Sequence, residues 1–564
     1  MIKNRINNLR KKFNELNIDG YVIPKNDEFF SEYAEIDRLK LISNFSGSAG
    51  YAIILKKRNY LFVDGRYTIQ AKKECGNNFK IIDYNKLYNC NLFKNYKLGL
   101  NPKLFTFDQI SRFFRKSKIQ LIISDLISDS FNNRIPINKP FFSIDEKISG
   151  ESHFSKINKI TNFLKRKKAT MIFISAPENI AWLLNIRGYD NPNSPIPNCH
   201  LIIDNKKKIY LIAKKEKAKK LIKEKKLSNN QIIDPKNFLS FIEKYSNGTM
   251  IIDKKTCSIF YENFLKRKFK IIKIDDPIYL LKAKKNKTEI NNMIKTHIYD
   301  GVALTKFLYW IKNLNKKNIT EVDAQNKLEY FRKKNKNYLY PSFNTIAGSG
   351  SNGAIVHYRA KKKSAKKILK KDIFLCDSGG QYKFGTTDVT RTICFAEPKK
   401  MIKDIFTKVL KGHISVASTN LKKDNIGRKI DIRARKFLKK SNLDYAHGTG
   451  HGVGFFLNVH EGPQSISKFN QIKIKEGMIL SNEPGYYEKN NFGIRIENLV
   501  YVKKSKKNLL FENLTIAPIE KDLINYRLLT NLEKDYLFKY HLIVYSKLSK
   551  YLNSDEKKWL ASFI

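Results

Sequence analysis

The stretch DIFLCDSGGQYKFGTTDVTRTICF, residues 372–395, decides the fold more than any other part of the chain. It has two strand-like arms around a glycine-rich turn, and it contains two acids, Asp377 and Asp388. Their midpoint lies between Tyr382 and Lys383, so a hairpin centred there would set the carboxylates opposite each other, roughly 5 Å apart. Buried like charges repel, so this pair requires a cation or a proton. Taken alone, it is equally well explained as two exposed acids flanking a turn.

A second pair of acids repeats this pattern downstream. In MILSNEPGYYEKNNFGIRIENLV, residues 478–500, Glu483 and Glu497 share a midpoint at Asn490 within a turn-rich segment. Strand alternation places Arg495 on the same face as Glu497, where its guanidinium is expected to orient a ligand carboxylate. The alternative for Arg495 is an ordinary surface arginine. Two hairpins that each supply two carboxylates favour a metal site over isolated surface acids.

Histidines gather between the two hairpins. The stretch HGTGHGVGFFLNVHEGP, residues 447–463, contains His447, His451 and His460 in a chain that has only nine histidines. The glycines around them lack Cβ atoms, so the backbone can approach a ligand closely. A lone histidine is usually structural, but three histidines between two carboxylate pairs indicate a site. His357, upstream of the first hairpin, is a further candidate, although by itself it would be read as structural.

The predicted side chains suit a pair of cations. One imidazole and four carboxylates are ligands that hard or borderline divalent ions prefer, and the absence of cysteine ligands argues against a structural zinc site. Four carboxylates balance the charge of two divalent ions, so a water shared by the ions would lose a proton easily and act as a nucleophile. The expected reaction is therefore metal-assisted hydrolysis of an acyl bond.

The chain is too long for one hydrophobic core, since it has 564 residues. Periodicity predicts a helix over residues 2–17, a strand over 19–24 and a strand pair around the turn at Lys56–Asn59, and a second α/β round begins near Ile157. A long amphipathic helix is expected over residues 288–314. Four parts are predicted: mixed α/β domains over residues 1–145 and 150–280, the domain with the site residues over 282–505, and a helical C-terminal extension over 510–564.

The formal net charge of +56 raises the question of nucleic-acid binding. Lysines occur in every segment, including the stretch KKEKAKKLIKEKK at 214–226, which is expected to be a solvated helix. No nucleic-acid-binding motif accompanies the charge, so specific binding is not expected. Affinity for RNA that survives about 0.2 M salt would speak for it, because phosphate contacts weaken steeply with ionic strength.

The compartment is predicted from cysteines and apolar runs. Six scattered cysteines, Cys90 among them, form no CxxC pair and are expected to be free thiols. No apolar run approaches the roughly 20 residues of a membrane helix, and the basic N-terminus leads into an amphipathic pattern instead of a signal core. A cytoplasmic protein with no membrane partner is expected.

At these residues the chain resembles the aminopeptidase P branch of the pita-bread metallopeptidases. The resemblance covers nearly the whole chain and includes FSGSAGYAIILKKRNYLFVDGRYTIQA at 45–71, AWLLNIRGYD at 181–190 and LLTNLEKDYLFKYH at 528–541, besides the motifs above. It implies an α/β (α+β) fold of the three-domain type. Two creatinase-like N-terminal α/β domains would precede a pita-bread catalytic domain and a short helical C-terminal extension.

The resemblance also implies a role for each ligand. Asp377 would chelate one metal, Asp388 and Glu497 would bridge two metals, and His451 and Glu483 would hold the other metal. Glu483 would also help to move the proton of the attacking water. The two divalent ions are expected to be Mn²⁺.

The implied reaction is the release of the first residue from peptides with proline at the second position. His357 and His460 match catalytic, substrate-contacting histidines, and His447 matches a position that lines the substrate pocket. The family further implies a homodimer. Prolidase, which cleaves Xaa-Pro dipeptides, is the nearest alternative, and it is disfavoured by the three-domain layout and the C-terminal extension. Non-peptidase relatives such as creatinase predict the loss of ligands, and none is lost here.

Overall fold

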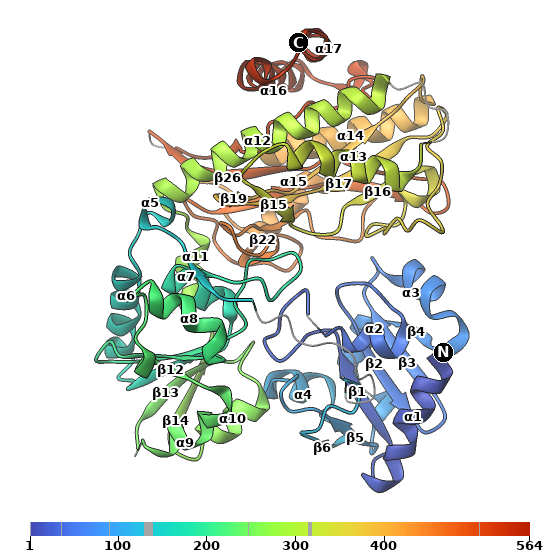
Figure 1. Ribbon diagram of the computed structural model, residues 1–564. Helices are drawn as coiled ribbons and strands as arrows, with labels where there is room; N and C mark the ends of the chain where they lie inside the picture. Colours follow the sequence, from blue (N-terminus) through green and yellow to red (C-terminus); the bar gives the residue numbers. More distant parts are fainter. Residues whose placement is uncertain are drawn as a thin grey trace. The chain divides into compact units, whose positions relative to one another are not determined.

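The chain folds into two compact units, Met1–Tyr279 and Leu280–Ile564. The computed structural model describes residues 2–34, 36–89, 91–128, 139–245, 247–313, 319–506 and 508–564 (Figure 1). Cys90 lies outside these residues, and the other five cysteines are free, as predicted. In the described part of the chain, no helix combines the length and the apolar character needed to cross a membrane.

The first unit contains a six-stranded sheet of order β4-β3-β2-β1-β5-β6. Helix α1 (Ile2–Glu15) packs its apolar residues at spacings of three and four into the core beside this sheet. Strands β1 (Gly20–Pro24), β2 (Tyr51–Leu55) and β3 (Asn59–Val63) pair antiparallel in chain order, which confirms the predicted helix, strand and strand pair. The remaining elements are β4 (Lys80–Asp83), β5 (Lys97–Leu100), β6 (Lys118–Leu121), α2 (Arg38–Ser43), α3 (Thr68–Cys75) and α4 (Phe107–Phe113).

The same unit contains a second six-stranded sheet, of order β12-β11-β10-β8-β13-β14. Its lysine-rich helix α8 (Lys215–Lys223) lies in the stretch predicted as a solvated helix, but Lys217 is buried and its Nζ lies 2.6 Å from a carboxylate oxygen of Asp190. One turn of the helix therefore packs inward through an ion pair. The other elements are β8 (Met171–Ile174), β10 (His200–Asp204), β11 (Ile209–Ile212), β12 (Ile232–Ile233), β13 (Thr249–Asp253), β14 (Lys270–Ile274), α6 (His153–Arg166), α7 (Pro177–Leu184), α9 (Phe238–Glu243) and α10 (Ile259–Leu265).

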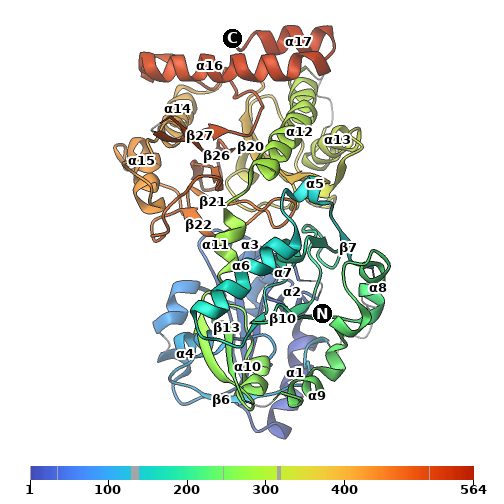
Figure 2. The same ribbon diagram turned by 90° about the vertical axis from the view of Figure 1, so that its left-hand side faces the viewer.

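The second unit contains small sheets flanked by helices. The long helix predicted near its start is α12 (Lys287–Asn313), which contacts β19, and α13 (Glu321–Lys333) contacts β16. Helices α14 (Lys400–Ala417) and α15 (Gly427–Lys439) contact β27 and β22 (Figure 2). The sheets are β15-β18-β19 (Tyr338–Pro341, Gly380–Tyr382, Gly385–Thr386), β16-β17-β20 (Ile346–Ser349, Phe374–Ser378, Val389–Ile393), β22-β21-β23-β26-β27 (Glu461–Ile466, Gly450–Gly452, Ile479–Asn482, Asn498–Ser505, Asn508–Asn513) and β24-β25 (Gly485–Glu488, Phe492–Arg495).

The register predicted for the first hairpin was wrong, because its centre lies one residue further along the chain and the partner of Asp377 lies two residues further. Asp377 pairs with Thr390, so the hairpin is centred between Lys383 and Phe384, and Asp388 is not the cross-strand partner of Asp377. The ladder between β17 and β20 stops at Gly379, which packs so closely on the backbone of residue 387 that a Cβ there would lie 2.0 Å from its carbonyl oxygen. The strands then re-pair as β18 and β19 in another sheet, a break that alternation alone does not reveal.

The register predicted for the second hairpin is confirmed. Strands β24 and β25 pair from Gly485 with Arg495 to Glu488 with Phe492, and their centre is Asn490, which has the positive φ of a tight turn. Glu483 and Glu497 lie in the same register, just beyond the paired residues.

The C-terminal extension is helical, as predicted. Helices α16 (Asn531–Leu548) and α17 (Ser554–Ala561) lie across the ends of α12 and α14 (Figure 2). Helix α16 starts with a capping box between Thr530 and Glu533, and it buries one face in a core shared with residues 492, 494 and 496 around β25. Tyr540 is 4% exposed and belongs to this core.

Glu321, at the start of α13, holds the loop that contains His357. Its buried carboxylate accepts hydrogen bonds from the backbone N–H groups of Ser349 and Lys366, both at 2.8 Å. It also accepts hydrogen bonds from the Asn352 amide (2.9 Å) and, at 2.8 Å, from the hydroxyl of Tyr358. One side chain therefore fixes both ends and the middle of the loop.

We predict that Glu321→Ala lowers the stability of the protein by about 3 kcal/mol or more. The substitution leaves several buried donors without an acceptor, and each such donor costs about 1–3 kcal/mol. Urea unfolding followed by circular dichroism measures the effect. Glu397→Ala is the matched control, because Glu397 is 78% exposed and forms a surface ion pair with Lys403. Equal midpoints for the two variants would contradict the prediction.

Candidate metal centre

Five acidic and imidazole side chains converge in the second unit. Asp377 lies on β17 and Asp388 just before β20, while His451 lies on β21. Glu483 follows β23, and Glu497 precedes β26. The structure therefore brings together the five residues predicted as ligands, although they are spread over 121 positions of the chain.

These side chains form two overlapping groups. Ligand atoms of Asp377, Asp388 and Glu497 lie within 4.8 Å of one another, and so do those of His451, Glu483 and Glu497. Glu497 belongs to both groups. A donor set of this kind offers two adjacent positions for cations that share a carboxylate.

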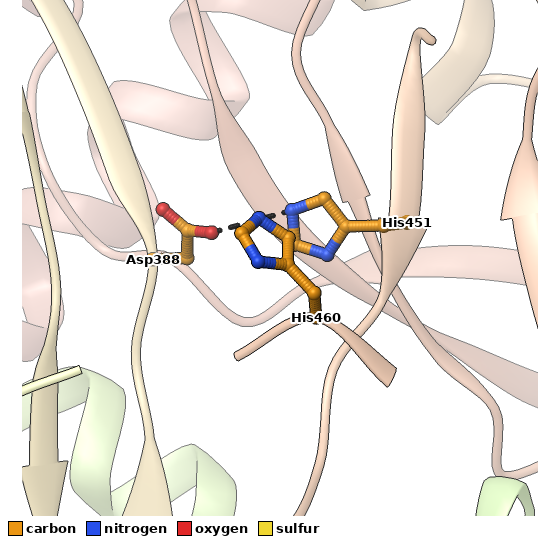
Figure 3. Close-up of side chains that lie close together, drawn as sticks. All are labelled: Asp388, His451 and His460. Carbon is orange, nitrogen blue, oxygen red and sulfur yellow. Dashed lines mark ion pairs between the residues drawn. The ribbon is translucent and has the colours of Figure 1, made fainter. Parts of the chain in front are cut away.

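His460 joins the centre through a third group. In Figure 3 the rings of His451 and His460 lie next to each other and beside the carboxylate of Asp388, and the ring centroids are 4.3 Å apart. His451 Nε2 lies 3.4 Å from Asp388 Oδ2 and 3.5 Å from Glu483 Oε1. Its Nδ1 is 2.9 Å from the carbonyl oxygen of Gly452, and donation to that oxygen leaves Nε2 directed at the carboxylates.

Arg495 connects the centre to His447. Its buried guanidinium donates to Asp377 Oδ2 at 2.5 Å and to the hydroxyl of Tyr487 at 2.6 Å. That hydroxyl lies 2.8 Å from Nε2 of His447. The expected contact of Arg495 with a ligand carboxylate is present. Tyr487 was not singled out from the sequence, although it lies in the same NEPGYYE motif as Glu483.

Two hydroxyl groups orient the glutamates. Thr390 Oγ1 donates to Glu497 Oε2 at 2.7 Å, and Ser481 Oγ donates to Glu483 Oε1 at 3.0 Å. Ser481 Oγ also accepts the backbone N–H of His451 at 2.9 Å. Ser481 is close to Glu483 in the sequence, whereas Thr390 lies on β20, 107 residues before Glu497, so only the fold shows the second pairing.

Arg391 ties the backbone of the site to the C-terminal extension. Its buried guanidinium donates to the carbonyl oxygens of Glu497 (2.7 Å), Ala517 (2.9 Å) and Pro518 (2.8 Å). It also donates to the hydroxyl of Tyr540 on α16 at 3.0 Å. The position of Glu497 thus depends on a helix that begins 34 residues later.

The pKa values of the clustered side chains indicate that the site favours bound positive charge. Burial, together with the neighbouring carboxylates, raises the pKa of Glu497 well above its usual range. Burial also raises the pKa of Asp377 to about 6, against the lowering effect of Arg495. Burial lowers the pKa of His451, but the carboxylates of Asp388 and Glu483 outweigh it and raise this pKa to about 9. The raised pKa of Glu497 therefore favours its protonated form in the absence of a cation, and a metal would displace that proton.

The donor atoms fit divalent cations. Asp377 Oδ1 is buried and has no hydrogen-bond partner within the described residues, although its other oxygen is bound by Arg495. A buried carboxylate oxygen without a donor is costly unless a cation binds it. Together with the oxygen-rich donor set, this atom indicates that the residues present can hold two metal ions.

Within the described residues, His357 and His447 are not part of the three groups of ligand atoms that make up this centre. His447 reaches the centre only through Tyr487 and Arg495. The loop of His357 packs nearby, because Ile355 and Ala360 contact the same small apolar cluster as Tyr487. The structure thus places both histidines around the five converging side chains instead of among them.

Sequence comparisons match most of the chain to known families. Residues 291–504 match Metallopeptidase family M24, and residues 507–562 match the C-terminal region of peptidase M24. Residues 5–121 and 133–289 each match the Creatinase/Prolidase N-terminal domain. The predicted fold, with two creatinase-like domains before a pita-bread domain and a helical extension, is confirmed.

Full-length relatives narrow the family. "Probable Xaa-Pro aminopeptidase P" of Laccaria bicolor is 36% identical, over 99% of this chain and 92% of that protein. The crystal structure of X-prolyl aminopeptidase from Caenorhabditis elegans is described as that of a cytosolic enzyme with a di-nuclear active site. It superposes with a TM-score of 0.92 at 29% identity, and the match covers 100% of this chain and 99% of that chain. Prolidase from Pyrococcus furiosus is 27% identical, with a TM-score of 0.52, and the match covers 63% of this chain and 98% of the prolidase chain. The chain belongs to metallopeptidase family M24, in the branch of the Xaa-Pro aminopeptidases P.

Proposed function

We propose that the protein is a metal-dependent aminopeptidase that hydrolyses the N-terminal Xaa-Pro bond of peptides. The observation that carries this proposal is the pair of ligand groups that share Glu497, in a chain whose full length matches Xaa-Pro aminopeptidases. The prolidase alternative is weaker, because the solved prolidase covers only 63% of this chain.

The proposed ligands are the five converging side chains. Asp377, Asp388 and Glu497 would hold one ion, and His451 and Glu483 would hold the other, with Asp388 and Glu497 bridging. Manganese is proposed because the donor set is rich in carboxylate oxygens. When bound, the two ions would polarise the scissile carbonyl and lower the pKa of water.

Side chains of the protein would transfer the protons in the reaction. Glu483 is proposed to take the proton of the attacking water, because its side chain is 17% exposed and reaches solvent, whereas Glu497 is buried. The departing proline nitrogen carries no hydrogen and needs a proton. His460, whose ring lies 4.3 Å from that of His451, and His357 are proposed to contact the substrate there and to stabilise the intermediate.

His447 is proposed to line the pocket for the peptide. Its Nε2 is bound by the hydroxyl of Tyr487, which Arg495 holds in turn, so the ring keeps a fixed orientation. A fixed ring beside the metal centre orients a substrate with a small loss of entropy.

The remaining proposals concern the whole chain. The division into residues 1–145, 150–280, 282–505 and 510–564 is proposed as the domain structure. A cytoplasmic location is proposed because the relative from Caenorhabditis elegans is described as cytosolic. A homodimer is proposed from family resemblance.

We predict that the manganese-loaded protein cleaves an Xaa-Pro-Yaa tripeptide and releases the first residue. An Xaa-Pro dipeptide and an Xaa-Ala-Yaa tripeptide should be poor substrates, and a chelator should stop the reaction until manganese is restored. Liquid chromatography of the products with each peptide measures this. Exclusive cleavage of the dipeptide would assign the protein to prolidases instead.

We predict that Asp388→Asn lowers kcat/KM by about 10³-fold or more and reduces the bound manganese. The amide keeps the size of the side chain but removes the charge that both ions share. Metal content by mass spectrometry and tripeptide turnover measure the two effects. Asp535→Asn is the matched control, because Asp535 lies on the exposed face of α16 and pairs only with Lys539. Full activity of Asp388→Asn would refute the ligand assignment.

A further inference from the structure

A run of lysines follows His357 in the second unit. The stretch KKKSAKKILKK, residues 361–371, contains seven lysines in eleven residues and no acid before Asp372. All seven lysines are exposed, whereas Ile368 in the middle is buried in the core. The segment is therefore an anchored surface loop, not a disordered charged tail.

The backbone of this lysine run is fixed on both sides. Lys366 donates its N–H to Glu321 and accepts the N–H of Glu321 on its carbonyl oxygen at 3.0 Å, and Ile368 N–H donates to the carbonyl oxygen of Ile319 at 2.8 Å. At the far end, Asp372 lies 3.4 Å from the hydroxyl of Ser349. The lysine charges thus have a defined place.

That place lies at the far end of the strand pair that carries Asp377. Ser349, which contacts Asp372, pairs with Phe374 of β17, three residues and roughly 10 Å along the strand from Asp377. Gly353, before the run, packs against Gly493 of β25 so closely that a Cβ on Gly493 would lie 1.9 Å from the carbonyl oxygen of Gly353. Strand β25 also carries Arg495, which binds Asp377. The run begins four residues after His357, so the two Cα atoms of His357 and the first lysine are at most about 14 Å apart.

Four of the seven lysines in the run have no acidic partner in the part of the chain that the structure describes. Within the described residues, Lys362, Lys363, Lys370 and Lys371 form no ion pair. Lysines of the run on α8 behave differently, since two of them pair with acids, at 2.6 Å and 3.7 Å. A concentrated, unpaired positive charge at a fixed place attracts anions over roughly 8 Å at physiological salt.

We propose that the lysine run at 361–371 binds acidic residues of the peptide substrate that follow the proline, an inference that rests on the proposed function. The free amino group of the substrate would enter the carboxylate-rich centre, and an acidic segment further along the peptide would meet the lysines. Opposite ends of the substrate thus meet opposite charges, which favours association in one orientation.

The test compares two peptides of equal length, Ala-Pro-Asp-Glu-Asp-Glu and Ala-Pro-Asn-Gln-Asn-Gln, on the manganese-loaded full chain. The acidic peptide should have a kcat/KM about 10-fold higher at about 20 mM salt, and the ratio should fall to about 2-fold at about 300 mM salt, because salt screens exposed charges. The preference should lie in KM. In the triple variant Lys362→Gln, Lys363→Gln and Lys370→Gln, the ratio should fall to about 1.

The matched control carries the same change of charge elsewhere in the second unit. Lys534, Lys547 and Lys558 are lysines of α16 and α17 with no ion pair in the described residues, and two of them, Lys534 and Lys547, lie on the solvent side of α16, opposite its buried face. Their triple change to Gln should keep the 10-fold ratio, which separates local recognition from the net charge of the protein.

Three outcomes would overturn the proposal. The first is equal rates for the two peptides in the unchanged protein, and the second is a ratio that survives in the lysine-run variant. The third is that the protein binds a short single-stranded RNA through the lysine run above about 0.15 M salt and shows no preference between the two peptides. Failure of both peptides to be cleaved would instead refute the proposed aminopeptidase function, so the two failures are distinguishable.

Discussion

The constraint on which the second unit depends is the repulsion among four carboxylates held together away from water. Two of them, Asp388 and Glu497, are at most 4% exposed, and Arg495 and His451 contribute nearby positive charge. Such a cluster is stable only when protons or cations balance it. Guanidinium and hydroxyl groups accordingly donate hydrogen bonds to several of the carboxylate oxygens. One oxygen of Asp377 has no partner among the residues that the structure describes. The fold that brings the carboxylates together therefore also favours the cations that the chemistry of the site would use.

Much of the site could be predicted from the sequence, because the residues repeat a simple pattern. The hairpin centred on Asn490 was placed correctly, since a tight turn with two flanking strands contains all the information needed. The centre of the hairpin of Asp377 was misplaced by one residue, because the prediction placed the two aspartates opposite each other, whereas the two-residue turn at Lys383 and Phe384 pairs Tyr382 with Gly385 and Asp377 with Thr390. Tyr487 was not predicted at all, since its partners His447 and Arg495 meet only after distant strands pair. Local patterns thus located the ligands, and long-range packing decided their surroundings.

Charge has different roles in different parts of this lysine-rich chain. On α8, Lys217 and Lys220 each form an ion pair with an acidic side chain, and the pair of Lys217 is buried. The acidic partners balance the charge of these two lysines. In the second unit, the lysine run is held by the buried carboxylate of Glu321 and leaves most of its charge to solvent. Net charge alone does not distinguish these roles, because it sums over both. The ion pairs of α8 and the backbone hydrogen bonds that hold the lysine run distinguish the two roles.

The contact between Arg391 and Tyr540 has a consequence for the biosynthesis of the protein. Helix α16 is translated after every residue of the metal centre, and the guanidinium that binds the carbonyl oxygen of Glu497 also binds the hydroxyl of Tyr540. A nascent chain still lacking α16 leaves this guanidinium without one partner, and the core around β25 stays open to water. The residues of α16 must therefore be synthesised before Arg391 has all of these partners and before the core around β25 is closed.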